Sequence, residues 1–260
     1  MRDLLGIGTN RGYSMAGLGI GLGLAEFKLG VASFSPVQIS GMELWLDASD
    51  SSTLLQASGG SSSAADGDPV GEWKDKSGKA RHLSQSDGTK KPALKTAIKN
   101  GRNAVRFDGT NDHLRTAVNY TLSNSFTVFL VAIRRSGGDA SYPYIWDNRA
   151  GNNGGMVWQL GGPFAMGAGA WLTGASVAND SAVLLCGIYN SSSSTLIQNG
   201  TTYTGNVGTN TFSLITLGDN GALNRPMSGD VCEMAFYNGV VSANDRTKMI
   251  NYLNEKWSIY

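Results

Sequence analysis

The chain has 260 residues, of which 16% are charged and 35 are glycine, and its net charge at pH 7 is +1. This balance lacks the basic surface that nucleic-acid binding requires, so we expect no nucleic-acid partner. The length and the turn-rich composition favour one large all-β domain preceded by an arm.

Residues 1–40 differ in composition from the rest of the chain. Their apolar run, residues 15–25, is too short to span a membrane. Within it glycines alternate with four apolar side chains that would share one face of an extended segment: Leu18, Ile20, Leu22 and Leu24. We expect an extended N-terminal arm that anchors the chain to another protein, with a linker at 33–40. A secretory signal segment and a plain extra strand remain alternatives.

We expect residues 41–260 to form the folded domain. Residues 41–50 and 70–78 each contain a short strand, and 51–69 is expected to be a long exposed loop. Residues 79–102 are polar and indicate a solvated face. Residues 104–107 and 113–116 suggest a hairpin-like pair, and 126–134 is the strongest strand pattern.

Residues 135–180 look rich in loops and contain the best candidates for a ligand site. Sugar sites combine aromatic rings, which stack on the sugar, with planar polar side chains, which bind its hydroxyls. That mixture occurs here at six positions: Tyr142, Tyr144, Trp146, Asp147, Asn148 and Trp171. The alternative for Trp146 is a strand residue packed in the core.

Strands are expected at 182–189, 195–198 and 212–217, with Asn199-Gly200 as a tight hairpin turn. A late strand at 231–237 alternates between two faces, with Glu233 and Tyr237 on one and Cys232 on the other. Ser242 then begins a helix whose buried face carries apolar residues at helical spacing: Met249, Ile250, Leu253 and Trp257.

This closing strand and helix, residues 229–257, resemble those of laminin-G-like, concanavalin A-type jelly rolls. Three earlier segments agree with the resemblance in order: GMELWLDASD, VGEWKDKSG and NAVRFDGTNDHL. The resemblance implies an all-β, two-sheet antiparallel jelly-roll sandwich with one C-terminal helix. Such modules also resemble ones found in bacteriophage structural proteins.

The sequence shows no recognisable catalytic motif. Paired acids occur as Glu43 with Asp47 and as Asp230 with Glu233, but neither pair places three acids on one strand face, so we expect no enzyme. No metal site and no cofactor is expected; calcium, which relatives of this fold bind, is left open at the oxygen-rich loops 66–68, 108–112 and 219–220. Cys186 and Cys232 are expected to be buried free thiols, with a disulfide as the alternative.

These observations predict a non-enzymatic virion protein of a phage, made in the host cytoplasm. Its arm would bind other virion proteins in an oligomeric assembly. Its lectin-like domain would bind cell-surface polysaccharide or decorate the particle as a capsid, fibre or tail component. The alternatives are a secreted bacterial carbohydrate-binding module and a glycosidase.

Overall fold

The computed structural model describes residues 34–260 apart from 118–120, 124, 139–140, 149–153 and 160–161. The expected arm, including Leu18, Ile20, Leu22 and Leu24, lies outside the described residues. Phe34–Tyr260 form one compact unit. In this part of the chain, no helix has the length and apolar character needed to cross a bilayer.

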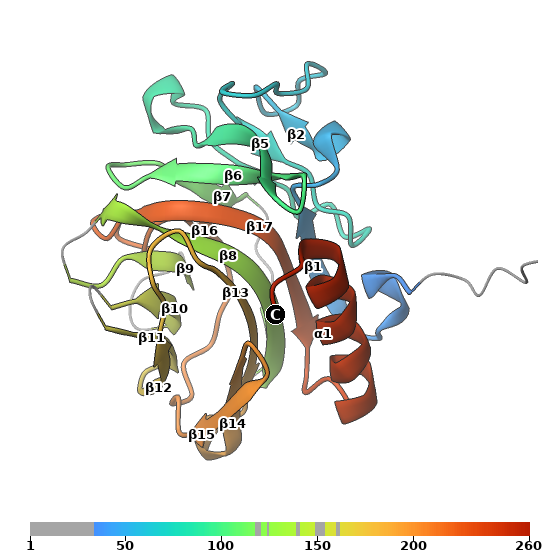
Figure 1. Cartoon of the computed structure of the whole chain (residues 1–260), viewed down its shortest axis with the longest axis vertical. Helices are drawn as coiled ribbons and strands as arrows, with labels where there is room; N and C mark the ends of the chain where they lie inside the picture. The colour runs from blue at the N-terminus through green and yellow to red at the C-terminus, as the bar shows by residue number, and fades with distance from the viewer. Residues whose placement is uncertain (1–33, 118–120, 124, 139–140, 149–153, 160–161) are drawn as a thin grey trace, which may run out of the picture. The chain divides into compact units, whose positions relative to one another are not determined.

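The unit is a sandwich of two antiparallel sheets, which confirms the predicted all-β architecture (Figure 1). Sheet A has the spatial order β15 (Thr201–Gly205), β14 (Ser194–Gln198), β13 (Ala182–Tyr189), β8 (Phe126–Gly138), β17 (Met227–Asn238), β6 (Arg102–Asp108) and β5 (Ala93–Lys99), and β1 (Met42–Asp47) pairs with β17. Sheet B has the order β12 (Trp171–Ser176), β11 (Pro163–Ala168), β10 (Gly154–Trp158), β9 (Tyr144–Asn148), β16 (Ile215–Leu217), β7 (Leu114–Thr116), β4 (Leu83–Ser84), β3 (Glu72–Trp73) and β2 (Leu54–Leu55).

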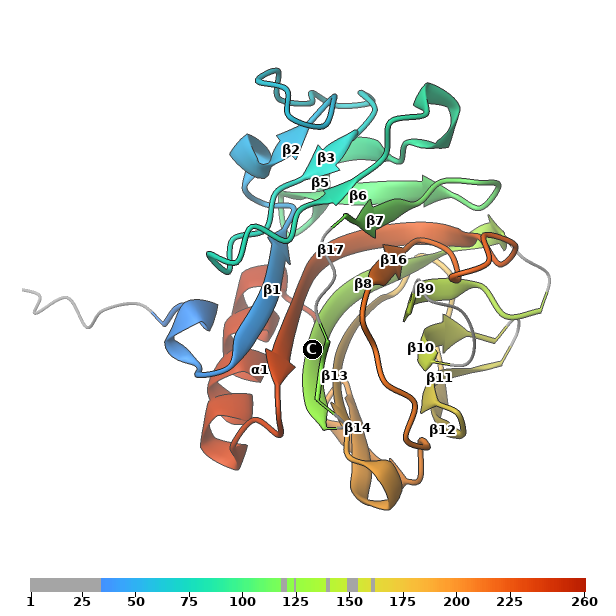
Figure 2. The same ribbon diagram turned by 180° about the vertical axis from the view of Figure 1, so that it is seen from behind.

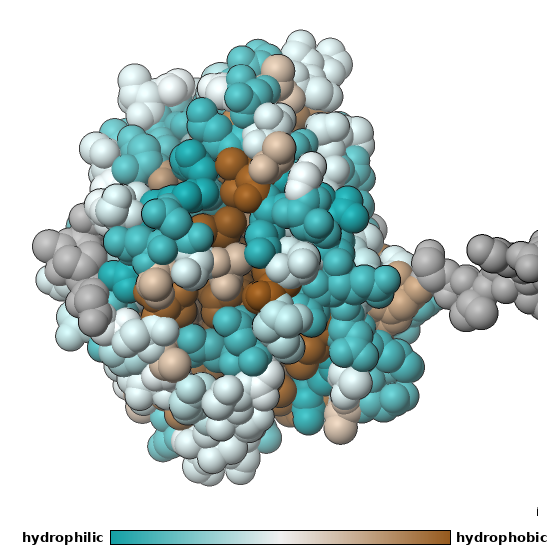
Figure 3. All heavy atoms as spheres, in the orientation of Figure 1, coloured by the Kyte–Doolittle hydropathy of each residue, from teal (hydrophilic) through white to brown (hydrophobic). Residues whose placement is uncertain are grey.

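Two hydrophobic clusters account for the layers. One lies between the sheets and includes Phe126, Trp146 and Phe236. The other lies on the outer face of sheet A, where α1 (Ala243–Trp257) covers the strands (Figure 1). Figure 3 shows the same face with patches of apolar surface between polar residues. Ala182 and Ile250, which pack against the outer cluster, are only partly buried.

The closing helix begins after the predicted N-cap and buries three of the four residues of its predicted apolar face, whereas Ile250 is only partly buried. The Ser242 hydroxyl accepts a hydrogen bond from the Asp245 amide, 3.1 Å away, which satisfies one of the free amides of the first turn. Met249, Leu253 and Trp257 are buried against sheet A. The Asn199-Gly200 turn is also confirmed, because it joins β14 to β15 with a positive φ at both residues.

β17 is the strand on which sheet A is assembled. One edge pairs along its length with β8; the other pairs first with β6 and then with β1, which runs beside it in Figure 2. A register shift between Val231 and Glu233 breaks the alternation that we expected. Val231 points into the sandwich, whereas both Cys232 and Glu233 lie on the outer side, because a bulge adds one residue to the strand.

Glu233 is fully buried beneath the helix and its carboxylate is surrounded by donors. It accepts hydrogen bonds from the indoles of Trp45 (2.8 Å) and Trp257 (2.7 Å) and from the Tyr252 hydroxyl (3.0 Å). Lys256 lies 2.7 Å from it and 2.8 Å from Asp47. Burial raises the pKa of Glu233, and Lys256 opposes that rise by stabilising the charged form.

Several expectations about local structure were wrong. β6 and β7 belong to different sheets, so residues 104–107 and 113–116 form no hairpin. The stretch 135–180, which we expected to be rich in loops, contains β9 to β12. The segment expected to be a linker is packed: Ile39 is buried in the outer cluster and the Phe34 ring contacts Tyr252.

The two cysteines are free and buried. Their strands, β13 and β17, are separated by β8. Two interstrand spacings of ~4.8 Å exceed the Cα separation that a disulfide can bridge. The alternative of a disulfide between Cys186 and Cys232 is therefore excluded in this fold.

We expect Trp257→Ala to lower the free energy of unfolding by about 3–5 kcal/mol, because it removes a fully buried ring and one hydrogen bond to Glu233. Urea unfolding followed by circular dichroism measures this change. Tyr260→Ala, which removes an exposed aromatic ring three residues later, is the matched control and should change stability by less than about 0.5 kcal/mol. Equal effects of the two substitutions would show that α1 does not stabilise the sandwich.

Candidate functional site

One pocket of about 440 Å³ combines exposed aromatic rings with buried polar groups on the outer face of sheet B. Its lining comes from β9, β10 and β12 and from the loop after β16: Tyr142, Tyr144, Asp147, Val157, Gln159, Trp171, Asn220, Ala222, Asn224 and Arg225. The volume is in the range of small-molecule sites.

A bulge in β9 brings the polar residues of this strand to the pocket. On the neighbouring strand Met156 pairs with Trp146, whereas Val157, the next residue, pairs with Tyr144, so β9 has one extra residue at Ile145. Met156 and Trp146 both point into the core between the sheets. Tyr144 and Val157 therefore share the outer face, and Asp147 joins them there because it follows Trp146 in the alternation.

Gly167 on β11 makes room for the Trp171 ring. A Cβ atom added at Gly167 would lie 2.7 Å from the indole, so the ring of Trp171 packs directly on the backbone of β11. The Tyr144 ring meets the Trp171 ring edge-on, with 6.1 Å between the centroids. Trp171 remains 41% exposed and Tyr142 49% exposed, which leaves aromatic surface for a ligand.

Asp147 is almost completely buried at the base of the pocket. Its carboxylate accepts hydrogen bonds from the amides of Asn148 (2.7 Å) and Gly221 (3.0 Å). Burial raises the pKa of Asp147 to about 6, and the neighbouring charge of Asp219 adds to the rise. Burial and the Asp147 charge likewise raise the pKa of Tyr144 to about 12, so its hydroxyl stays protonated at neutral pH.

The loop after β16 supplies the opposite wall and is held by its own side chains. Asp219 accepts hydrogen bonds from the amides of Asn220 and Arg225, each 2.7 Å long. The Asn220 side chain accepts a hydrogen bond from the Asn224 amide (3.0 Å) and donates one to the Asn224 side chain (2.9 Å). The loop therefore presents amides and a guanidinium to the pocket in a fixed arrangement.

The structure gathers four of the six candidate binding residues around this pocket: Tyr142, Tyr144, Asp147 and Trp171. Trp146 was a wrong choice, because it is fully buried among core aromatic rings and its indole N–H has no partner in the described part of the chain. The Asn148 side chain also points away, since it bonds to the backbone of Thr211 and Ser213.

Sequence reasoning missed Gln159, Asn224 and Arg225, which also line the pocket. The loop at 218–226 was noticeable only for its polar composition. Along the chain, three strands of sheet A, β13 to β15, separate this loop from the candidate stretch, and only the pairing of β16 with β9 places it beside Asp147.

The acid pairs considered for catalysis lie elsewhere. Asp47 and Glu233 are held by Lys256 under the helix, and Arg81 pairs with Glu43. Asp230 is buried between Arg106 and Arg135. No group of three His, Cys, Asp or Glu side chains that could hold a metal ion occurs among residues that the structure describes. Calcium binding at the acidic loops stays a prediction.

Comparison with known proteins identifies the fold. No family model matches the chain, and no curated protein matches it. Among solved structures, Trypanosoma rangeli sialidase matches with a TM-score of 0.56 at 11% identity, covering 85% of this chain and 34% of that chain. The same sialidase in complex with sialic acid gives 0.54 at 12% identity, with the same coverage. Domain 4 of the arabinanase AbnA from Geobacillus stearothermophilus gives 0.49 at 16% identity, covering 68% and 91%.

The likeness to the sialidase shows a shared fold, and the chain spans about a third of the sialidase chain. It also corrects one expectation. We expected no enzyme, partly because no catalytic motif is visible, but the same fold occurs within a chain that is a sialidase. The absence of a recognisable motif therefore does not exclude a glycosidase.

The raised pKa of Asp147 predicts a pH-dependent contribution to stability. Its folded-state pKa of about 6 lies above the ordinary 3.8, so between these values the folded chain holds a proton that the unfolded chain releases. Ionisation of Asp147 therefore lowers the free energy of unfolding as the pH rises through this window, by no more than about 3 kcal/mol.

We expect Asp147→Asn to remove this decrease in the free energy of unfolding with rising pH. The free energy of unfolding of the variant, minus that of the wild type, should increase from pH 4 to pH 7 in urea titrations. Asp112, whose pKa burial raises to about 7, titrates in both proteins and cancels in the difference. If the free energy of unfolding changed with pH in the same way in both proteins, the raised pKa of Asp147 would be contradicted.

Proposed function

We propose that the chain binds glycan in the pocket on the outer face of sheet B. The observation that carries this proposal is the placement of two half-exposed aromatic rings, Tyr142 and Trp171, around the buried carboxylate of Asp147. A sugar ring would stack on the aromatic surface, and its hydroxyls would donate to Asp147 and bind Gln159 and Asn224.

The physical design of the site supports a neutral or weakly charged sugar. Asp147 is already bonded to two amides, so it needs no ordering when a ligand arrives. The aromatic rings supply apolar contact without charge, and the amide side chains act as both donors and acceptors. The fold likeness to a sialidase solved with sialic acid is a further support for sugar as the ligand class.

A glycosidase is the second candidate, and Asp147 is the observation that favours it. A general acid needs a pKa near the working pH, and burial gives Asp147 a pKa of about 6. Asp219 is a second buried carboxyl whose charge acts on Asp147. In this case Asp147 would donate a proton to the leaving oxygen of a sugar bound between Tyr142 and Trp171.

We further propose that the glycan-binding domain belongs to a concanavalin A-like jelly roll carried on a phage particle, with residues 1–33 joining it to other virion proteins. The sequence resemblance of the closing strand and helix supports this placement. A secreted bacterial binding module is the alternative.

We expect Trp171→Ala and Asp147→Asn each to weaken binding to the best ligand of a glycan array at least about tenfold, because each removes a stacking surface or a hydroxyl acceptor. Tyr260→Ala is the matched control, since Tyr260 is an exposed tyrosine outside the pocket. Isothermal titration gives the dissociation constants. Unchanged binding by both pocket variants would reject this site.

The same variants separate binding from hydrolysis. If the wild type releases reducing sugar from a bound glycan, and the Asp147→Asn variant still binds this glycan but releases no sugar, the chain is a glycosidase. If the wild type binds the glycan and releases nothing over the pH range 5–7, the chain is a binding module.

A chain that begins at Phe34 should keep the melting midpoint of the full chain, because Phe34–Tyr260 form a compact unit that contains both hydrophobic clusters. If residues 1–33 are the anchor, the shortened chain should fail to enter the particle or the assembly in co-expression. If the shortened chain assembles normally, residues 1–33 are not the anchor. If it unfolds, residues 1–33 belong to the folded domain.

A further inference from the structure

Arg134 is a buried cation at the end of β8. Along this strand the side chains alternate: Ala132 lies in the core between the sheets, and Ile133 lies on the outer face of sheet A. Arg134 follows on the inner side, where it is 8% exposed, and Arg135 returns to the outer face. The guanidinium of Arg134 thus lies at the open end of the sandwich, between the sheets.

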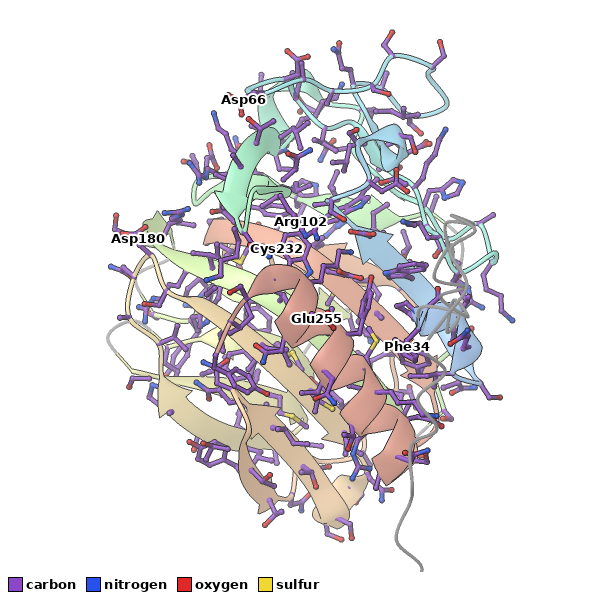
Figure 4. The ribbon with its side chains drawn as sticks, turned by 45° about the vertical axis from the view of Figure 1, so that its right-hand side comes forward. Phe34, Asp66, Arg102, Asp180, Cys232 and Glu255 are labelled. Atoms are coloured by element: carbon purple, nitrogen blue, oxygen red, sulfur yellow. The ribbon has the colours of Figure 1, made fainter. Side chains whose placement is uncertain are left out.

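The charges around it are not balanced. Asp230 pairs with Arg106 (2.6 Å) and with Arg135 (2.7 Å), and Arg135 also pairs with Asp180. Figure 4 shows Asp180 beside the end of β8. Among the described residues, Arg106, Arg134 and Arg135 thus lie near only two aspartates, Asp180 and Asp230, and both aspartates are paired with Arg135 or Arg106. In this part of the chain Arg134 has no acidic partner.

The hydrogen-bonding capacity of Arg134 is also largely unused. Its Nη1 donates to the Val177 carbonyl oxygen at 3.2 Å, which is its one bond within the described residues. A guanidinium carries five N–H groups in a planar fork. Burying such a charge without a counter-charge is unfavourable, so Arg134 lowers the stability of the sandwich unless an anion binds to it.

A second pocket, of about 610 Å³, opens in front of this side chain. It is lined by the end of β8 and by the turn after β12: Arg134, Arg135, Ser136, Gly137, Ser176, Val177, Ala178 and Asn179. None of these residues lines the glycan pocket. Apart from the two arginines, the lining carries no charged side chain, and the serines and Asn179 offer neutral donors.

We propose that this pocket binds an oxyanion, a sulfate, phosphate or carboxylate group, through the guanidinium of Arg134. Two oxygens of such a group match two parallel N–H groups of arginine, and the bond is charge-assisted. The anion would supply the counter-charge that the sandwich lacks. The site is independent of the glycan pocket, and it suits an acidic substituent of a polymer as well as a free anion.

The test is isothermal titration of the full chain with sodium sulfate, phosphate, acetate and glucuronate, at an ionic strength held constant with chloride. We expect the wild type to bind at least one of these anions. Arg134→Met keeps the length of the side chain and removes the charge, so it should weaken binding at least about tenfold. Tighter binding of glucuronate than of acetate would assign the site to a sugar acid, and equal affinities to a free anion.

Arg246→Met is the matched control, because Arg246 also donates to one backbone carbonyl, that of Val241, but lies outside the pocket. It should bind as the wild type does. If Arg134→Met does not fold, Arg134→Lys decides, since it keeps the charge but loses the planar fork and should bind more weakly. No binding by the wild type, or unchanged binding by the foldable Arg134 variant, would overturn the proposal.

Discussion

The buried carboxylate of Glu233 is the interaction that joins the parts of this fold. Its donors come from β1, through Trp45, and from α1, through Tyr252, Lys256 and Trp257. Asp47 lies on the other side of the Lys256 ammonium and also pairs with Lys76, so two carboxylates and two amines form one network beneath the helix. Because a buried charge is stable only when its donors are in place, the helix, the first strand and the last strand must be assembled together.

That arrangement depends on a bulge, and so does the proposed glycan pocket. The extra residue in β17 turns Glu233 to the outer face of sheet A, and the extra residue in β9 turns Tyr144 to the outer face of sheet B. In a regular strand, Tyr144 would share the face of Trp146 and point into the core. Two local departures from the pleat thus place the main polar groups of the domain.

The two outer faces of the sandwich have different uses. The outer face of sheet A is covered by α1, and its apolar strand residues serve the core. The outer face of sheet B carries exposed aromatic rings, with Trp171 packed on Gly167 of β11, and it holds the pocket that we propose as the ligand site.

The sequence alone determined the elements whose signals are local: the capped closing helix, the Asn199-Gly200 turn, the apolar strand β8 and the all-β class. It also named Tyr142, Tyr144, Asp147 and Trp171, because an aromatic and polar mixture is visible in composition. Tertiary structure decided the rest. Bulges exchange the faces of a strand without a sequence mark, which is why Tyr144 and Trp146, two residues apart, lie on opposite faces of sheet B. Only strand pairing brings Arg225 to Asp147 or leaves Arg134 without a counter-charge in the described residues.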